Sequence, residues 1–206
     1  MFIMSYVIGI GGVRATGKTT LSRSLSGILV TEPVSLGRFR AFLRGIYQEY
    51  GINTIETLPE FYQSITRTTN VDEAAKYLKL QAQHLIPGID RMVRHCRERK
   101  SNLVVEGTHV YPGIYPEGMF DLQVLLVAPS ETIERRLYKN KLRVKESDNE
   151  SMLLQRNIEL QEYLLQEAVK NNIHIINSES VEGALVKTVK LMPVSEVVVY
   201  HRKPNI

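Results

Sequence analysis

Apolar residues along the chain gather in short runs that alternate with longer stretches in which they recur every three or four positions. The short runs are rich in Val, Ile and Leu and predict buried β-strands, which we place at 6–10, 28–30, 102–105, 121–127 and 174–177. The longer stretches predict helices, which we place from residue 20 onward and at 37–50, 71–99, 130–143, 149–171 and 181–191. We also expect a helix break at Pro87-Gly88, a loop with a short helix over 52–70 and an edge strand over 195–200.

This alternation of strands and helices is typical of the α/β class, in which right-handed crossovers join parallel strands. The runs at 102–105 and 121–127 are apolar almost throughout, as in sheets that helices cover on both faces. A chain of 206 residues is long enough to form one domain with a full core. We therefore predict a single domain over 1–206, built on a five-stranded parallel sheet with ligands at the carboxyl ends of its strands.

A phosphate-binding motif follows the first predicted strand. Residues 12–19 fit G-x-x-x-x-G-K-[ST], the P-loop, and a helical pattern follows at once, which is the context that the motif requires. Loop amides and the helix amino end can then surround phosphate oxygens. The expected nucleotide-binding residues are Gly12, Val13, Arg14, Ala15, Thr16, Gly17, Lys18, Thr19 and Thr20. Lys18 is expected to reach the β- and γ-phosphates of ATP and the Thr19 hydroxyl to bind Mg²⁺, so we predict a P-loop NTPase fold of the nucleotide-kinase type.

The composition is that of a globular protein, with 43% hydrophobic and 23% charged residues. No apolar run approaches the ~18 residues needed to span a membrane, and the first residues lack the basic segment of a signal peptide. Cys96 is the only cysteine, so we expect a cytoplasmic chain without internal disulfides. The net charge of +4 comes without a dense Lys/Arg tract, which favours an arginine-lined phosphate pocket over a nucleic-acid surface.

Chemistry-bearing side chains follow the strand at 102–105 and line one predicted helix. Glu106 comes directly after that strand, where its carboxylate can hold a Mg²⁺-bound water or take a proton from an attacking hydroxyl. His109 lies three residues further on in a turn and could contact substrate. Arg40 and Arg44 are four apart and share a helix face, a spacing that suits a phosphate or carboxylate on a small substrate. Turn or surface roles are the alternatives for these residues.

The predicted helix at 130–143 carries several cations. Arg135 and Arg136 are candidates to close over the γ-phosphate, because arginines stabilise the charge that develops there during phosphoryl transfer. We therefore expect a lid around 130–147, with a solvated helix face as the alternative. The Asn-Lys-x-Asp signal of GTPases is not matched, since the sequence over 140–143 ends in arginine.

Several of these segments resemble the archaeal 2-phosphoglycerate kinase family. The stretch from Glu106-Gly107 through His109 to Pro112-Gly113 is similar to the Glu-Gly-x-His-x-x-Pro-Gly of that family. Arg40 through Arg44 resembles its Arg-x-x-x-Arg helix, and Gln81 through Ile89 and the segment 157–177 fall at similar places. The likeness covers most of the chain and is to a shorter form, without the N-terminal regulatory region of longer members.

The chain departs from the family pattern at Gly37, where an acid is expected, and in the P-loop at Arg14 and Ala15. The resemblance implies a kinase that uses ATP and Mg²⁺ to convert 2-phosphoglycerate to 2,3-bisphosphoglycerate, with Arg40, Arg44 and His109 positioning the acceptor.

Two other functions remain open at this point. The first is a nucleoside or nucleotide kinase, and the second, of a different class, is a nucleotide-dependent switch or a nucleic-acid-binding ATPase. The expected partner is a small anionic molecule and not a membrane. The sequence leaves the oligomeric state and the choice between ATP and GTP open.

Overall fold

The computed structural model describes residues 5–51, 70–139 and 150–192. Its centre is a five-stranded sheet in the order β2-β3-β1-β4-β5, with every neighbouring pair parallel. The strands are β1 (Val7–Gly11), β2 (Pro33–Ser35), β3 (Leu103–Glu106), β4 (Leu122–Val127) and β5 (His174–Asn177). The predicted α/β fold is therefore confirmed, and the P-loop leaves the sheet from its central strand.

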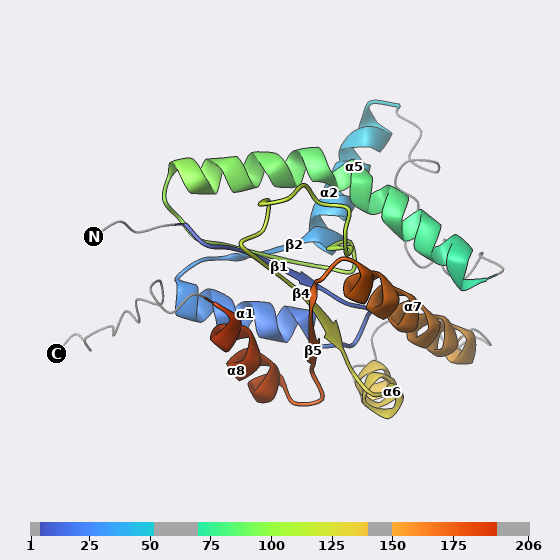
Figure 1. Cartoon of the computed structure of the whole chain (residues 1–206). Helices are drawn as coiled ribbons and strands as arrows, with labels where there is room; N and C mark the ends of the chain where they lie inside the picture. The colour runs from blue at the N-terminus through green and yellow to red at the C-terminus, as the bar shows by residue number, and fades with distance from the viewer. Residues whose placement is uncertain (1–4, 52–69, 140–149, 193–206) are drawn as a thin grey trace.

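Helices cover both faces of the sheet (Figure 1). They are α1 (Lys18–Leu29), α2 (Leu36–Glu49), α5 (Val71–Glu98), α6 (Ser130–Lys139), α7 (Glu150–Lys170) and α8 (Val181–Leu191). α1 and α8 lie on one face, whereas α2 and α5 lie on the other, with α7 beside α5 and α6 beside α7.

The alternation of side chains along β1 divides the core between these two layers. Ile8 and Ile10 are fully buried in the cluster that includes Leu21 and Leu25 of α1. Val7 points the other way and joins the cluster under α2 and α5. Because both faces of the strand are buried, its apolar run has no polar alternation, as the sequence predicts for a covered parallel sheet.

Two expectations about individual elements are wrong. The strand predicted at 28–30 does not form: α1 continues through Leu29, which follows Leu25 at helical spacing, and ends at Val30 with φ 51°. The strand of this region is β2, which begins at Pro33 on the edge of the sheet, where proline is tolerated. The break expected at Pro87-Gly88 is also absent, since α5 runs through both residues as one helix that changes direction along its length (Figure 1).

Other expectations are confirmed or lie outside the described residues. The strand at 174–177 and the helix at 181–191 have the predicted bounds, and the remaining helices agree to within a few residues over the described part of the chain. The expected edge strand over 195–200, most of the loop over 52–70 and the lid beyond 139 lie outside the described residues.

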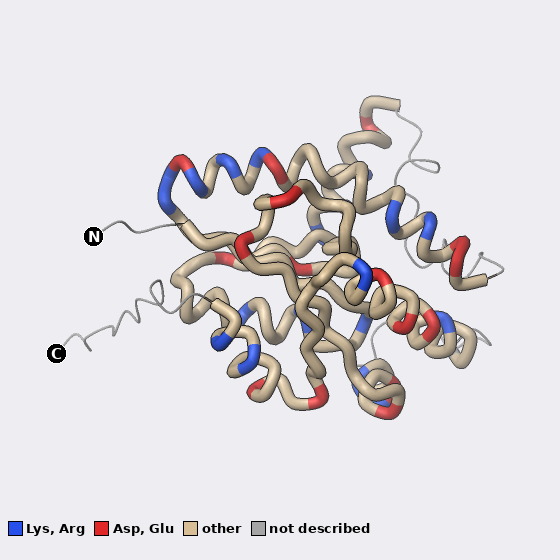
Figure 2. The backbone as a smooth tube through the Cα atoms, in the orientation of Figure 1, with Lys and Arg blue, Asp and Glu red and all other residues tan. Residues whose placement is uncertain are grey.

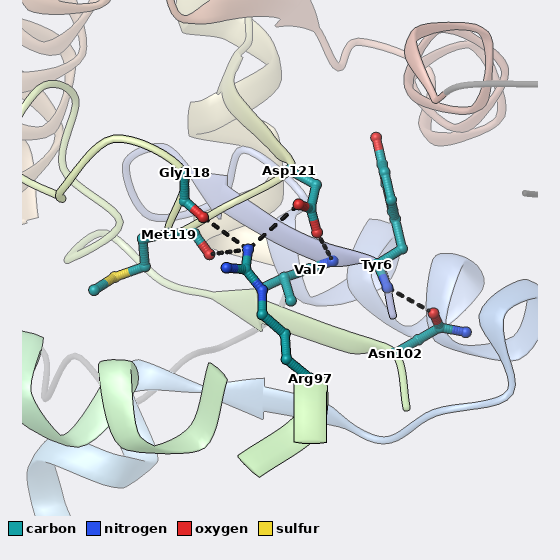
Figure 3. A network of polar contacts seen from close by, with 7 residues as sticks. All are labelled: Tyr6, Val7, Arg97, Asn102, Gly118, Met119 and Asp121. Carbon is teal, nitrogen blue, oxygen red and sulfur yellow. Dashed lines mark hydrogen bonds and ion pairs between the residues drawn. The ribbon is translucent and has the colours of Figure 1, made fainter. Parts of the chain in front are cut away.

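A polar network fixes the amino ends of the central strands (Figure 3). The Asp121 carboxylate accepts a hydrogen bond from the Val7 N–H (2.7 Å) and pairs with Arg97 of α5 (3.3 Å). Arg97 also donates to the Gly118 carbonyl (2.7 Å). These contacts join α5, β1 and the segment before β4 at the end of the sheet opposite the P-loop.

Candidate active site

The P-loop turns away from β1 through two glycines in the left-handed region. Gly12 has φ 136° and Gly17 has φ 90°, conformations that residues with a side chain rarely adopt. A Cβ on Gly12 would also lie 2.6 Å from the carbonyl oxygen of Leu126, a backbone atom that cannot easily move aside. Both motif glycines are therefore required by the geometry of the loop.

A side-chain amide from α7 holds the middle of the P-loop. Asn157 accepts a hydrogen bond from the Arg14 N–H (3.2 Å) and donates to the Arg14 carbonyl (3.0 Å). Gln161, four residues along the same helix, makes the same pair of bonds to Ala128, just after β4 (2.9 and 3.0 Å). α7 therefore ties the P-loop and the entrance to α6 to one rigid helix.

Two further contacts hold the next carbonyl groups of the loop. Arg136 of α6 donates to the Ala15 carbonyl (3.2 Å), and Ser178, after β5, donates to the Thr16 carbonyl (2.5 Å). The C=O and the following N–H of a trans peptide point in opposite directions, so a fixed Thr16 carbonyl turns the Gly17 N–H to the other side of the loop. Amides held in this way next to the amino end of a helix suit an anion.

Lys18 lies buried at the start of α1. Its ammonium donates to the Val13 carbonyl over 2.6 Å and its side chain is 9% exposed. Burial lowers the pKa of Lys18 to about 8, although the nearby Glu106 carboxylate favours the charged form. The group is therefore mostly protonated at pH 7, and phosphate oxygens would be stronger partners for it than the neutral carbonyl.

Glu106 and Thr19 meet beside this lysine. The Thr19 hydroxyl donates to Glu106 Oε1 over 3.3 Å, and Glu106 lies buried at the end of β3, opposite Ile10 of β1. Hydroxyl and carboxylate oxygens are ligands that Mg²⁺ accepts, so this pair fits a magnesium ion held jointly with nucleotide phosphates. No group of three or more His, Cys, Asp or Glu side chains in the described part of the chain could hold a metal alone.

His109 forms a second buried polar centre after β3. Its Nε2 lies 3.0 Å from Oε1 of Gln81 on α5, and its carbonyl accepts a hydrogen bond from the Tyr115 hydroxyl (2.6 Å). Burial lowers the pKa of His109 to about 3, helped by the positive charges of Arg40 and Lys18. The imidazole is therefore neutral at physiological pH and acts through hydrogen bonds, not through charge.

The structure brings several predicted site residues together. Arg40 of α2 is half-buried and close enough to His109 to affect its pKa, while Arg44 lies one turn further along the same helix face and is also half-buried. Arg135 donates to the Thr132 hydroxyl (3.3 Å) within α6.

Arg136 donates hydrogen bonds to three backbone carbonyls. Besides the Ala15 carbonyl it binds the carbonyls of Ser178 (2.7 Å) and Glu179 (3.0 Å), and burial, with the neighbouring Arg135 charge, lowers its pKa from the usual range. These carbonyls occupy N–H groups of the guanidinium, and the expected contact of Arg135 and Arg136 with phosphate stays a prediction.

Three residues of this candidate site were not predicted from the sequence. Gln81 had a usable signal, because it is a polar residue on the apolar face of an amphipathic helix. Asn157 and Ser178 had none, since they act on backbone groups of the P-loop that are 143 and 162 residues away in sequence.

Comparison with known proteins gives two similar sequences. One, from Pyrococcus horikoshii, is 25% identical over 199 residues, which is 90% of this chain and 66% of that protein. The other, from Thermococcus kodakarensis, is 22% identical over 186 residues, 85% of this chain and 62% of that protein. Both are named 2-phosphoglycerate kinase. The chain thus spans slightly less than two thirds of the length of these relatives, and no protein-family model matches it.

Solved structures with the same fold are also kinases. An unliganded sugar kinase from Janibacter sp. HTCC2649 superposes with a TM-score of 0.52 over 96% of this chain and 99% of that protein. Thymidylate kinase from Candida albicans gives 0.51 over 91% of each chain. Each is 12% identical, so the likeness establishes the P-loop kinase fold and not a substrate.

Charged residues of both signs are interspersed along most of the described helices, such as α5 and α7 (Figure 2). No helix among the described residues has the length and apolar character needed to cross a membrane.

Proposed function

We propose that the protein is a Mg²⁺- and ATP-dependent kinase that transfers the γ-phosphoryl group to a hydroxyl of a small anionic molecule, with 2-phosphoglycerate as the acceptor. The observation that carries this proposal is the contact between Thr19 of the P-loop and the strand-end carboxylate of Glu106. It supports the proposal because a hydroxyl that could bind a metal ion and a buried acid then lie close to the Lys18 ammonium, and phosphoryl transfer uses such a set of groups. The names of both similar sequences support the choice of acceptor.

The nucleotide side of the reaction depends on the P-loop. Its amides and Lys18 bind the triphosphate, and Lys18 exchanges the Val13 carbonyl for phosphate oxygens. Thr19 and Glu106 are the residues that would hold Mg²⁺, which supplies charge neutralisation to the β- and γ-phosphates. Glu106 either orients a water of that ion or takes the proton from the attacking hydroxyl.

The acceptor side depends on α2 and the turn after β3. Arg40 and Arg44 provide guanidinium groups for the carboxylate and phosphate of the acceptor, since planar forks bind such groups in a bidentate manner. His109 contributes a neutral hydrogen bond next to them. Arg135, and Arg136 after release of its carbonyl partners, would approach the γ-phosphate from the lid.

One assay tests the function directly. Purified protein is incubated with ATP and Mg²⁺ and a panel of phosphorylated acids, sugars, nucleosides and nucleotides, and products are identified by ³¹P NMR. We expect 2,3-bisphosphoglycerate from 2-phosphoglycerate. Phosphorylation of a nucleoside or nucleotide in its place would make the chain a nucleoside or nucleotide kinase. ATP hydrolysis that no acceptor stimulates, with salt-sensitive binding to DNA or RNA, would indicate the nucleic-acid-binding class.

The arginine pair gives a test of the acceptor class. Arg44→Ala should raise the acceptor KM by about 10-fold or more, the loss expected for a charge-assisted pair of ~1.5–3 kcal/mol, with little change in the ATP KM. Arg44→Lys should recover only part of the loss, because lysine cannot make the bidentate contact. An unchanged acceptor KM in Arg44→Ala would show that Arg44 does not bind the acceptor and that this face of α2 is an ordinary surface.

A further inference from the structure

Gln81 occupies a position of α5 that faces the core. The buried residues of this helix are Ala74, Ala75, Leu78, Gln81, Ala82, Leu85, Ile89 and Val93, and Gln81 is the polar member of the set. Its side chain is 1% exposed. Burial of an amide costs free energy unless both of its ends are hydrogen-bonded, so a glutamine here requires partners that its apolar neighbours cannot provide.

One end of this amide has a partner and the other does not. Gln81 Oε1 lies 3.0 Å from Nε2 of His109. Gln81 Nε2 is buried and has no hydrogen-bond partner within residues 5–51, 70–139 and 150–192. Buried donors without a partner are rare in native proteins, and each requires an explanation such as a bound water or ligand. An N–H group donates, so the missing partner must bring an oxygen or another acceptor atom.

The surroundings indicate which molecule supplies that atom. His109 follows Glu106 by three residues, and the positive charges of Arg40 and Lys18 act on its ring. The Gln81 amide, bonded to this histidine, therefore lies in the part of the site where the charges of Arg40 and Lys18 act. These two positive charges favour a molecule with carboxylate or phosphate oxygens, and those oxygens are hydrogen-bond acceptors.

We propose that Gln81 is a specificity residue for the phosphoryl acceptor, donating its amide N–H to an oxygen of that anion while its Oε1 holds His109. This inference rests on the proposed kinase function. The arginines attract the anion by charge, and a neutral donor can in addition fix its orientation, because a hydrogen bond depends on angle more than an ion pair does. Gln81 therefore helps to distinguish one anionic acceptor from another.

The first test replaces Gln81 with methionine, which keeps the length and apolar packing of the side chain and removes the amide. Initial rates are measured with 2-phosphoglycerate varied at saturating ATP, and with ATP varied at saturating 2-phosphoglycerate. We expect Gln81→Met to raise the acceptor KM by about 10-fold, with the ATP KM unchanged within about twofold. Titration calorimetry with 2-phosphoglycerate in the presence of ADP and Mg²⁺ should show the same loss without turnover.

Two further variants separate binding from packing. Ser26 of α1 is also buried, and its Oγ has no hydrogen-bond partner among the described residues, so Ser26→Ala removes a comparable atom away from the site and should change neither KM. In a His109→Phe background, Gln81→Met should still raise the acceptor KM, because the direct donor is lost in addition to the histidine. No added effect in that background would mean that Gln81 acts only through His109 and would overturn the proposal.

Other outcomes also decide the matter. The proposal is overturned if Gln81→Met binds 2-phosphoglycerate as the wild type does, or if its ATP KM rises by the same factor as its acceptor KM. A wild-type protein that binds ATP but neither binds nor phosphorylates 2-phosphoglycerate would instead contradict the acceptor named above. The same comparison is then made with the panel compound that the wild type phosphorylates, and the same outcomes support or overturn the role of Gln81.

Discussion

Asn157 gives the most direct test of how the P-loop is held. Replacement by alanine removes both hydrogen bonds to the Arg14 backbone, at 3.2 and 3.0 Å, and leaves in place every residue expected to touch the nucleotide. We expect Asn157→Ala to fold and to bind ATP more weakly. The reason is that a loop which is no longer fixed in advance must be ordered when the nucleotide binds.

The size of the effect follows from the two bonds. An ordinary hydrogen bond contributes about 0.5–1.5 kcal/mol net, so the loss of two should lower the free energy of unfolding by about 1–3 kcal/mol. Asn157 is 7% exposed, so water replaces the lost partners poorly. If about half of this cost appears as loop freedom, the Kd for ATP should rise by about 2- to 10-fold, since about 1.4 kcal/mol corresponds to a factor of ten.

Gln161 provides a matched control on the same helix. It makes the same pair of bonds, at 2.9 and 3.0 Å, but to Ala128 and not to the P-loop. Gln161→Ala should therefore lower the free energy of unfolding by a similar amount and change the Kd for ATP by less than about twofold. Urea unfolding measures the stability of both variants, and titration calorimetry with ATP and Mg²⁺ measures their Kd.

The comparison has two results that would refute this reasoning. Equal increases in Kd for Asn157→Ala and Gln161→Ala would show that general destabilisation, and not the Arg14 contact, weakens binding. An unchanged Kd in Asn157→Ala, with the expected loss of stability, would show that the loop needs no support from α7.

Three further predictions concern the buried ionisable groups. Lys18→Ala should keep the circular dichroism spectrum of the wild type and lose ~10²-fold or more in activity. The wild type should bind ATP more weakly above about pH 8, where Lys18 loses its proton, and the variant should not show this pH dependence. Wild-type turnover in the variant would remove Lys18 from the mechanism. Glu106→Gln should reduce kcat much more than it raises the ATP Kd, because we propose that the acid acts mainly in the transition state. A change in the ATP Kd alone would make Glu106 a binding residue. His109 has its pKa lowered to about 3 in the folded state, so only the unfolded state takes up its proton as the pH falls below 6.5. The free energy of unfolding should then drop by about 2 kcal/mol between pH 7 and pH 5 in urea titrations, and an equal drop in His109→Gln would exclude this residue as the cause.

Local signals predicted the parts of this molecule that short stretches of sequence determine. The P-loop is one, because Gly12 and Gly17 must adopt positive φ and a strand and a helix must flank them. The helix Val181–Leu191 is another, since its amino end is capped by Ser180, which accepts a hydrogen bond from the Gly183 N–H.

The errors came from segments in which one pattern fits two structures. Three apolar residues at 28–30 fit a strand or the end of a helix. The helix forms because helical spacing buries Leu29 in the same cluster as Leu25. At Gly88 the pair Pro-Gly suggested a break, but a Cβ there would lie 2.7 Å from the Phe39 ring. The glycine therefore permits α2 and α5 to approach, a requirement that appears only after the two helices pack.

Contacts between residues far apart in the sequence divide the candidate site into two halves. This division could not be predicted from the sequence, and it bears on which kinetic constant each substitution should change. α6, α7 and the turn after β5 hold the P-loop, whereas α2, α5 and the turn after β3 carry the candidate acceptor residues. The two halves meet at Lys18 and Glu106, because the charge of Glu106 affects the pKa of Lys18 and the charge of Lys18 affects the pKa of His109. Substitutions in one half should therefore change one KM, because we propose that each half binds one substrate. Large losses in kcat should be confined to Lys18, Glu106 and any lid arginine that reaches the γ-phosphate, where the transferred group would contact both halves.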